Sequence, residues 1–245
     1  MKLLPLLIGF FFCNSAYSQY EDFKLSFDSH NTIKPIIHSI DYEYFTQVKK
    51  IGFKSMPEVV QQCDNWDSLI SVDEIELMRH KIRMDSVFNV LQLKYPQAFL
   101  QMNSCLSLFC TDTTFKICNQ KEDNIKSETS YRFVDYQYGY LIVEHTGYEQ
   151  WEFVLFNPKS RVLKLTNNLP YFANDSIVSS SGNYSGDGNF QLMQTNGNLY
   201  FGFESYDWEI NECYRINKKF YLYFMPTWQQ RQNPKYLELD FGELF

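Results

Sequence analysis

The spacing of apolar residues in this chain changes near residue 98. Before that point the clearest pattern is helical, and its apolar positions are Leu77, Met84, Phe88 and Leu91. Charged side chains occupy mainly the other positions, and Pro96 ends the pattern because the residue before a proline disfavours helix. The sequence predicts an amphipathic helix over about 73–94, docked on its own domain by its apolar face.

After residue 98, apolar and polar residues alternate with the period of two that is typical of strands. Twelve short strands are predicted: Leu106–Phe109, Thr114–Cys118, Thr129–Val134, Tyr140–His145, Glu152–Phe156, Val162–Leu165, Ser176–Ser180, Phe190–Gln194, Leu199–Phe203, Glu209–Arg215, Phe220–Met225 and Tyr236–Asp240. Asn196-Gly197 is the strongest hairpin signal, because both residues tolerate the positive φ of a primed turn. Between Phe220 and Phe224 both alternating faces are bulky, which predicts a central strand buried on both sides.

Residues 19–97 form a mixed N-terminal segment before the β-rich domain, 98–245. Alternating apolar residues from Phe23 to Phe27 indicate a strand, and the proline and acid that follow Met56 are placed as at the start of a short helix. The predicted fold class is mainly β, α+β overall. Its β-rich part is an antiparallel propeller-like meander or sandwich, preceded by a small helical N-terminal segment.

Residues 1–18 have the pattern of a secretory signal peptide. Lys2 precedes an apolar run from Leu3 to Cys13, and Ala16-Tyr17-Ser18 supplies the small residues that signal peptidase requires. The run is about half of the roughly 20 apolar residues that span a bilayer, so we expect cleavage before Gln19. The alternatives are an uncleaved anchor and lipidation of Cys13. Cleavage would leave 227 residues, periplasmic or extracellular, without a transmembrane anchor.

The net charge narrows the range of partners. Without the signal, 21 Lys and Arg residues stand against 29 Asp and Glu residues, a formal charge of −8. An acidic chain without a basic cluster is a poor partner for nucleic acid or an anionic membrane surface, whereas neutral or cationic partners fit. Modest acidity also serves solubility alone, and that interpretation stays open.

Five cysteines remain after cleavage: Cys63, Cys105, Cys110, Cys118 and Cys213. If Thr111-Asp112 is a two-residue turn, Cys105 and Cys118 lie opposite each other on a hairpin and are placed for a disulfide. The alternative is that these cysteines are buried, unpaired thiols. No metal site is expected, because there is no C-x-x-C pair and no histidine lies near another histidine or a cysteine in the sequence.

Aromatic residues make up 18% of the chain and gather in the predicted strands. Exposed tryptophans can stack on sugar rings, and the candidates for ligand binding are Trp151, Trp208 and Trp228, with Trp66 in the N-terminal segment. Burial of large aromatic rings stabilises packed sheets, so each tryptophan is also a candidate core residue.

Motifs of catalysis are absent from the sequence. It has no G-x-S-x-G elbow, H-E-x-x-H helix, phosphate-binding glycine loop or dinucleotide fingerprint. The nearest constellation is Glu144, His145, Glu149 and Glu152, but adjacent residues on a strand point to opposite faces, so Glu144 and His145 would not cooperate directly. No catalytic residue and no cofactor is predicted.

Two stretches resemble the rhythm of a β-propeller blade of the WD40 or TolB type: Trp151–Arg161, a strand that ends in a polar turn, and Leu169–Val178. The chain departs from that pattern, because Ala173-Asn174-Asp175-Ser176 stands where the family has Ser-Pro-Asp-Gly, and Trp-Asp and Gly-His signatures are missing. It also resembles uncharacterised exported proteins of Gram-negative bacteria. Twelve strands give three blades of four, fewer than a closed propeller usually has, which leaves an open meander or a sandwich.

Two classes of function remain. The first is a non-catalytic envelope protein that binds a protein or a glycan through the β-rich domain, an immunity protein being one form. The second is a secreted polysaccharide hydrolase, which would need two carboxylates about 5 to 10 Å apart. The first class is preferred because no carboxylate pair is evident in the sequence.

Overall fold

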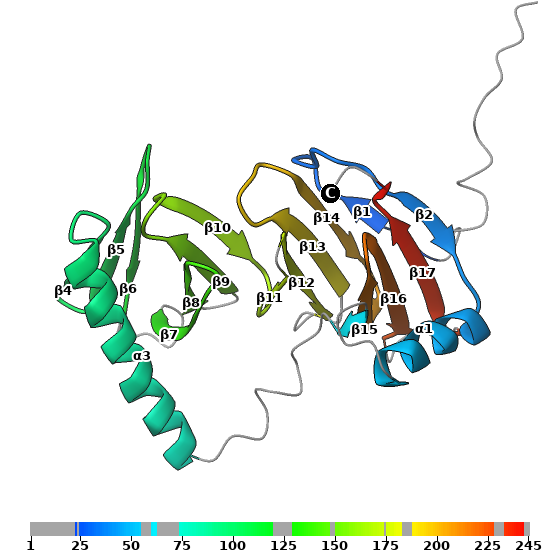
Figure 1. Cartoon of the computed structure of the whole chain (residues 1–245), viewed down its shortest axis with the longest axis horizontal. Helices are drawn as coiled ribbons and strands as arrows, with labels where there is room; N and C mark the ends of the chain where they lie inside the picture. Colours follow the sequence, from blue (N-terminus) through cyan, green and yellow to red (C-terminus); the bar gives the residue numbers. More distant parts are fainter. Residues whose placement is uncertain are drawn as a thin grey trace, which may run out of the picture.

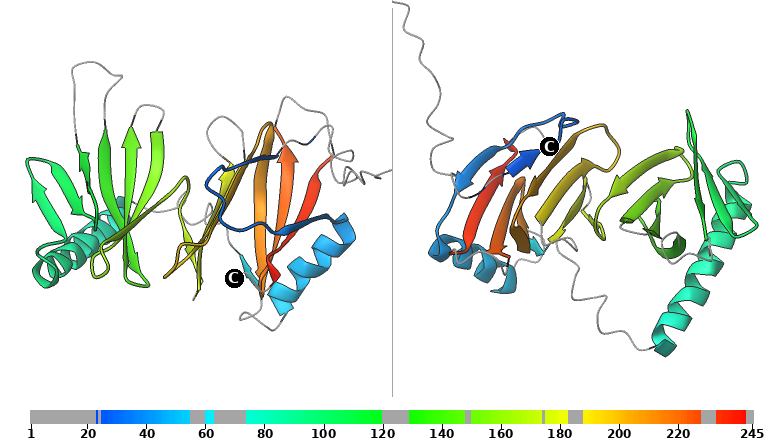
Figure 2. Two further views of the ribbon diagram at one scale, coloured as in Figure 1. Left: turned by 90° about the horizontal axis from the view of Figure 1, so that it is seen from above. Right: turned by 180° about the vertical axis from the view of Figure 1, so that it is seen from behind.

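A computed structural model describes residues 23, 25–54, 60–62, 74–119, 129–147, 150–173, 175–182, 188–227 and 233–242. The predicted signal peptide, 1–18, lies outside these residues. Within them, four antiparallel sheets follow one another along the long axis of the molecule, with one helix near each end (Figure 1). Figure 2 shows the same order from above and from behind.

Strands that are consecutive in the sequence pair with each other in every sheet. The first sheet contains β4 (Phe99–Met102), β5 (Cys105–Phe109) and β6 (Thr114–Cys118). The second contains β7 (Ser130–Gln137), β8 (Tyr140–Gly147), β9 (Gln150–Asn157) and β10 (Val162–Thr166). The third contains β11 (Tyr171–Phe172), β12 (Ser176–Gly182), β13 (Gly188–Gln194) and β14 (Tyr200–Ser205). The fourth contains β15 (Trp208–Ile216), β16 (Lys219–Pro226) and β17 (Lys235–Asp240).

The predicted fold class, mainly β and α+β overall, is confirmed, and each of the twelve predicted strands overlaps an observed one. The first and last sheets stand at opposite ends of the molecule, so the described strands form a row and not a ring (Figure 1). The resemblance to a propeller blade therefore stays a prediction about local strand rhythm.

Strands from the N-terminal segment complete the last two sheets. β1 (Leu25–Phe27) pairs with β14, whereas β2 (Ile36–Ser39) and β3 (Val60–Gln62) pair with β17 and β15. The helix expected after Met56 is wrong at Val60–Gln62, where pairing with β15 forms a strand; its predicted start lies outside the described residues. These added strands cover the edges of β14, β15 and β17, so fewer backbone groups of those strands can pair with another chain.

Apolar cores lie between all neighbouring sheets. The second sheet shows the arrangement: Leu141 and Val143 of β8 face the first sheet, whereas Tyr140 and Ile142 face the third. The third and fourth sheets enclose the largest core, which contains Trp208 at 0% exposure. The second and third sheets are thus each covered on two faces.

β16 is the central strand of the fourth sheet, as the sequence predicted. Its Phe220, Leu222 and Phe224 enter the core shared with the third sheet. Its other face packs against α1 (Tyr42–Lys54) through Phe45 and Val48. The sequence analysis missed this helix.

The N-terminus of α1 is capped by Asp41. The Asp41 carboxylate accepts a hydrogen bond of 2.7 Å from the backbone N–H of Tyr44. This short polar signal, followed by the apolar Phe45 and Val48, was available in the sequence.

The second helix, α3 (Glu74–Lys94), matches the predicted amphipathic helix. Met84, Phe88 and Leu91 are buried between the helix and the first two sheets, and the Phe88 ring stacks on Phe133 at 4.4 Å. Leu77 lies on the same side of the helix by its spacing but is 43% exposed, so its expected burial is wrong.

Turn chemistry was predicted less well than strands. The hairpin at Asn196-Gly197 exists, but five residues separate β13 from β14, and Gly197 has no positive φ. A Cβ at Gly197 would lie 1.8 Å from Oε1 of Gln194, so a larger residue there would displace the end of that side chain. Positive φ values occur in the turns at Asn103-Ser104 and Tyr138-Gly139, which lack an Asn-Gly signal.

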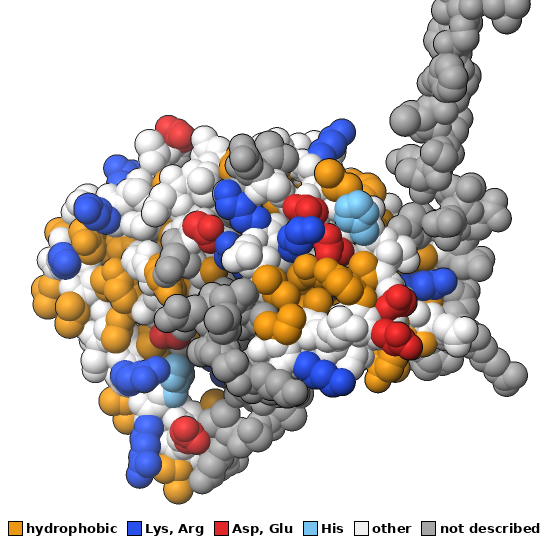
Figure 3. Space-filling model, turned by 45° about the vertical axis from the view of Figure 1, so that its right-hand side comes forward, with side chains coloured by type: hydrophobic (Ala, Val, Ile, Leu, Met, Phe, Trp, Pro, Cys, Tyr) orange, Lys and Arg blue, Asp and Glu red, His pale blue; other side chains and the backbone are white. Residues whose placement is uncertain are grey.

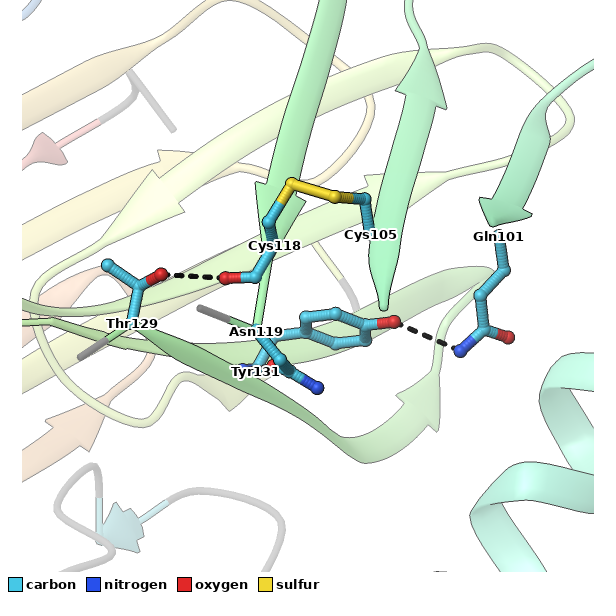
Figure 4. The surroundings of a disulfide bond; sticks show 6 residues. All are labelled: Gln101, Cys105, Cys118, Asn119, Thr129 and Tyr131. Carbon is cyan, nitrogen blue, oxygen red and sulfur yellow. Dashed lines mark hydrogen bonds between the residues drawn. A yellow bond between two sulfur atoms is a disulfide. The ribbon is translucent and has the colours of Figure 1, made fainter. Parts of the chain in front are cut away.

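The disulfide predicted between Cys105 and Cys118 is present and joins opposite residues of β5 and β6 (Figure 4). Beside it, the Thr129 hydroxyl donates to the carbonyl of Cys118 at 2.7 Å, and Gln101 donates to the Tyr131 hydroxyl at 3.0 Å (Figure 4). These contacts connect the first sheet to the start of the second. The other two cysteines within the described ranges, Cys110 and Cys213, are buried thiols.

We expect replacement of both bridged cysteines, Cys105→Ser with Cys118→Ser, to lower the free energy of unfolding by about 3 kcal/mol, because the short closed loop no longer restricts the unfolded chain. Urea denaturation under non-reducing conditions measures the loss. The control changes Ser107 and Lys116, a cross-strand pair of the same hairpin, to alanine. An equal loss in the control would show that hairpin packing, and not the covalent link, stabilises this sheet.

Candidate functional site

The third sheet has a polar patch on the face that it turns toward the second sheet. Met193 on this face belongs to the apolar core between the two sheets. Gln191 and Asn189 precede it at alternate positions of β13, so they share its face. The patch borders a pocket of about 190 Å³. Its polar lining is Ser26, Asp28, Asn167, Asn189, Gln191 and Glu204.

Three aromatic residues complete the lining of the pocket. Tyr200 and Phe203 come from β14, and Phe27 comes from the neighbouring strand β1. Only Tyr200 lies on the polar face, because the Phe27 ring contacts Phe203, which is buried in the core on the opposite face. Amides, carboxylates and a phenol therefore meet in one small hollow.

The centre of the pocket is a hydrogen bond between Tyr200 and Asp28. The Tyr200 hydroxyl donates to Oδ2 of Asp28 at 2.7 Å, and the backbone N–H of His30 donates to Oδ1 at 2.8 Å. The Tyr200 side chain passes over Gly202, where a Cβ would lie 2.5 Å from the Tyr200 hydroxyl oxygen.

The segment that follows β1 is pinned to β14. The Asn31 side chain exchanges two hydrogen bonds with the backbone of Gly202, at 2.9 and 2.6 Å. The Thr32 hydroxyl accepts a hydrogen bond of 2.7 Å from the backbone N–H of Tyr200. These bonds fix the wall that carries Asp28.

The opposite wall follows the end of β10 and is also fixed by hydrogen bonds. Gln191 Oε1 accepts a hydrogen bond of 2.9 Å from the backbone N–H of Asn167. Asn168 donates from its side-chain amide to Oδ1 of Asn189, also at 2.9 Å. An amide group has two donors and one acceptor with two lone pairs, so each retains capacity for a ligand.

Burial and hydrogen bonds set the pKa values of Tyr200 and Asp28 in the pocket. Burial raises the pKa of Tyr200, the hydrogen bond to Asp28 adds to this, and the result is about 12. Burial also raises the pKa of Asp28, but hydrogen bonds from His30 and Tyr200 outweigh it and hold the pKa below the ordinary 3.8. Asp28 is therefore ionised and Tyr200 protonated at neutral pH.

The tryptophans predicted as ligand-binding candidates have different positions. Trp208 is fully buried in the core between the third and fourth sheets, so its ring has no face for a sugar. Trp151 is 42% exposed on the second sheet, and its Nε1 donates to Glu144 at 2.9 Å. Trp228 and Trp66 lie outside the described residues.

The acidic constellation of the second sheet divides as predicted. Glu144 contacts Arg132 and Trp151 on one face, whereas His145 lies on the other and contacts Glu152 at 2.9 Å. Glu149 lies outside the described residues. The structure therefore does not bring these acids into one site. Among the residues with described positions, no group of three or more His, Cys, Asp and Glu is arranged to hold a metal ion.

The sequence analysis missed the pocket because its residues come from four separate segments. Asp28, Asn167, Gln191 and Tyr200 are each ordinary in their local sequence. The polar residues at alternate positions of β13, Asn189 and Gln191, were the one available signal.

Comparison with protein-family models, curated proteins and solved structures finds no match to this chain. Neither of the helices in the described part of the chain combines the length and apolar character needed to cross a membrane.

Tyr200→Phe tests the central hydrogen bond. We expect it to lower the free energy of unfolding by about 1 kcal/mol at pH 7, because the Asp28 carboxylate loses a donor. The Tyr200 pKa is raised in the folded state from 10.0 to about 12, so its contribution is complete below pH 10 and is lost as the pH rises through 12. The gap between wild type and variant should therefore narrow between pH 10 and 12.

Asp28→Asn is the matched control. The difference in free energy of unfolding between wild type and this variant should disappear at low pH and not at high pH. The depressed Asp28 pKa makes its contribution present above pH 3.8 and lost as the pH falls through the folded-state value. Urea denaturation across pH measures both gaps. A Tyr200→Phe gap that is constant from pH 8 to 12 would contradict the assignment.

Proposed function

We propose that this chain is a non-catalytic binding protein and that the pocket on the third sheet binds a hydroxyl-rich ligand, one sugar unit of a glycan. The single observation that carries the proposal is the convergence of Asp28, Asn189, Gln191 and Glu204 on one hollow beside the Tyr200 phenol. Sugar hydroxyls both donate and accept hydrogen bonds, and amides and carboxylates are their complementary partners.

The size and charge of the pocket support a small neutral or cationic ligand. Its volume of about 190 Å³ is below the roughly 300–1,000 Å³ of pockets for drug-sized molecules, so it suits one ring or the end of a chain. The described lining has two carboxylates and no lysine or arginine, which disfavours phosphate and other anions. The disulfide supports the expectation of export, because such bonds persist in oxidising compartments.

A hydrolase is the second candidate, because Asp28 and Glu204 provide two carboxylates in one pocket. A glycoside hydrolase needs one carboxyl group that is protonated and acts as the general acid. Asp28 is held ionised by its hydrogen bonds, so the acid would have to be Glu204, which is exposed. This arrangement favours binding over catalysis.

Isothermal titration with a panel of defined oligosaccharides tests the proposal. The panel contains peptidoglycan fragments, chitin oligomers, mannans, xylans and α- and β-glucans. We expect one class to bind, and Gln191→Ala and Glu204→Gln each to weaken its affinity about tenfold, since a hydrogen bond to the ligand is lost.

Trp151→Ala is the control, because Trp151 is exposed on another sheet and outside the pocket. The thermal midpoint of each variant shows that the fold persists. Binding that is lost in Trp151→Ala and retained in Gln191→Ala would refute the assignment of the pocket. Release of reducing sugar from a panel member would replace the binding function with the hydrolase.

A further inference from the structure

The helix α3 is apolar on two opposite faces. One face carries the buried Met84, Phe88 and Leu91. The other carries an outer stripe of exposed side chains, Ile75 (55%), Met78 (60%), Ile82 (60%), Val90 (63%) and Leu93 (84%). Their spacing follows the helical repeat of about 3.6 residues, so they line one side of the helix.

Such a stripe needs an explanation, because soluble proteins seldom expose aligned apolar side chains without a partner. The N-terminal half of α3 projects beyond the sheets (Figure 1). In the lower left of Figure 3, this projection presents hydrophobic, basic and acidic side chains together. The stripe is exposed from Ile75, near the start of the helix, to Leu93, near its end.

We propose that α3 is a dimer interface, in which the outer stripe packs antiparallel on the same stripe of a second copy. The stripe is symmetric about residue 84. A two-fold axis at that point places Ile75 opposite Leu93, and Met78 opposite Val90, of the second copy. A two-fold interface must be self-complementary in this way.

The shape of the helix surface supports the same register. A hollow of about 570 Å³ lies beside the N-terminal half and is lined by Ile75, Glu76, Arg79, His80 and Arg83. Leu93 is the most exposed member of the stripe. The two-fold axis brings Leu93 of the second copy to the level of Ile75, which forms one edge of this hollow.

Charge complementarity favours the antiparallel arrangement. It places Glu76 beside Lys94, and Asp85 beside Lys81, of the second copy. Lys81 already lies 3.1 Å from Asp85 within its own helix, so the carboxylate can be shared. A parallel arrangement would instead set the basic stretch 79–83 against itself. One interaction in the antiparallel register is unfavourable, because Arg83 of each copy comes near Arg83 of the other at the axis.

Sedimentation velocity of the purified chain over a range of concentrations is the first test. We expect a monomer–dimer equilibrium whose Kd rises at least tenfold in Ile82→Glu. Ile36→Glu is the matched control, because Ile36 is 63% exposed on β2 at the other end of the molecule. Its Kd should equal that of wild type. A chain that is monomeric at every concentration would overturn the proposal.

Arg83→Gln separates a second copy from other occupants of the stripe. Loss of the like charge at the axis should tighten the dimer by twofold or more. It would weaken binding to an acidic protein or to an anionic phospholipid vesicle, so a weaker complex overturns the proposal.

Cross-linking tests the register. A mixture of Ile82→Cys and Ser86→Cys chains should form a disulfide-linked heterodimer on mild oxidation, because these positions face each other across the axis. Neither variant alone, nor wild type, should cross-link to the same extent. Equal cross-linking of all samples would contradict the antiparallel register.

Discussion

The fold depends on sheets that are apolar on both faces. β8, β13 and β16 each place large side chains on both sides, so each sheet needs a neighbour on two sides. A row of sheets satisfies this requirement everywhere except at its ends. The first sheet can stand at an end of the row because apolar and polar side chains alternate along β5. Leu106 and Leu108 point inward, while Ser107 lies on the outer face. The fourth sheet has aromatic residues on its outer face, and α1 covers part of them.

The candidate pocket lies where this rule is broken. The face of the third sheet toward the second begins as an apolar core at Ile177 and Met193 and then becomes polar at Gln191 and Asn189. Burial of unpaired polar groups is costly, and here hydrogen bonds from segments distant in sequence compensate. Sites that depart from the local rule of a fold are where function is expected. The pocket therefore arises from an exception in the packing and contains no sequence motif.

The features that the sequence predicted well are those set by alternation within one strand. The register of Cys105 with Cys118 followed from the position of one turn, and the central place of Phe220–Phe224 followed from its bulk on both faces. The features it missed depend on contacts between distant segments. Gly202 is required because the Tyr200 side chain crosses it to reach Asp28, and nothing near Gly202 in the sequence indicates this. A ligand set made of residues from 28 to 204 has no local spacing to detect.

The outer stripe of α3 is the opposite exception, because apolar residues stand where the end of the row should be polar. The sequence pattern concealed it: with apolar residues on two opposite sides of the helix, neither side stands out as the single apolar face of an ordinary amphipathic helix. The predicted face, represented by Met84 and Phe88, was right. Leu77 lies on the same face by its spacing but is exposed, because the N-terminal half of α3 projects beyond the sheets (Figure 1). A helix that buries one face in its own domain and exposes a second has no structural need for the second. Its apolar character is then best explained by a surface outside the chain, and the symmetry of the stripe about residue 84 selects a copy of itself.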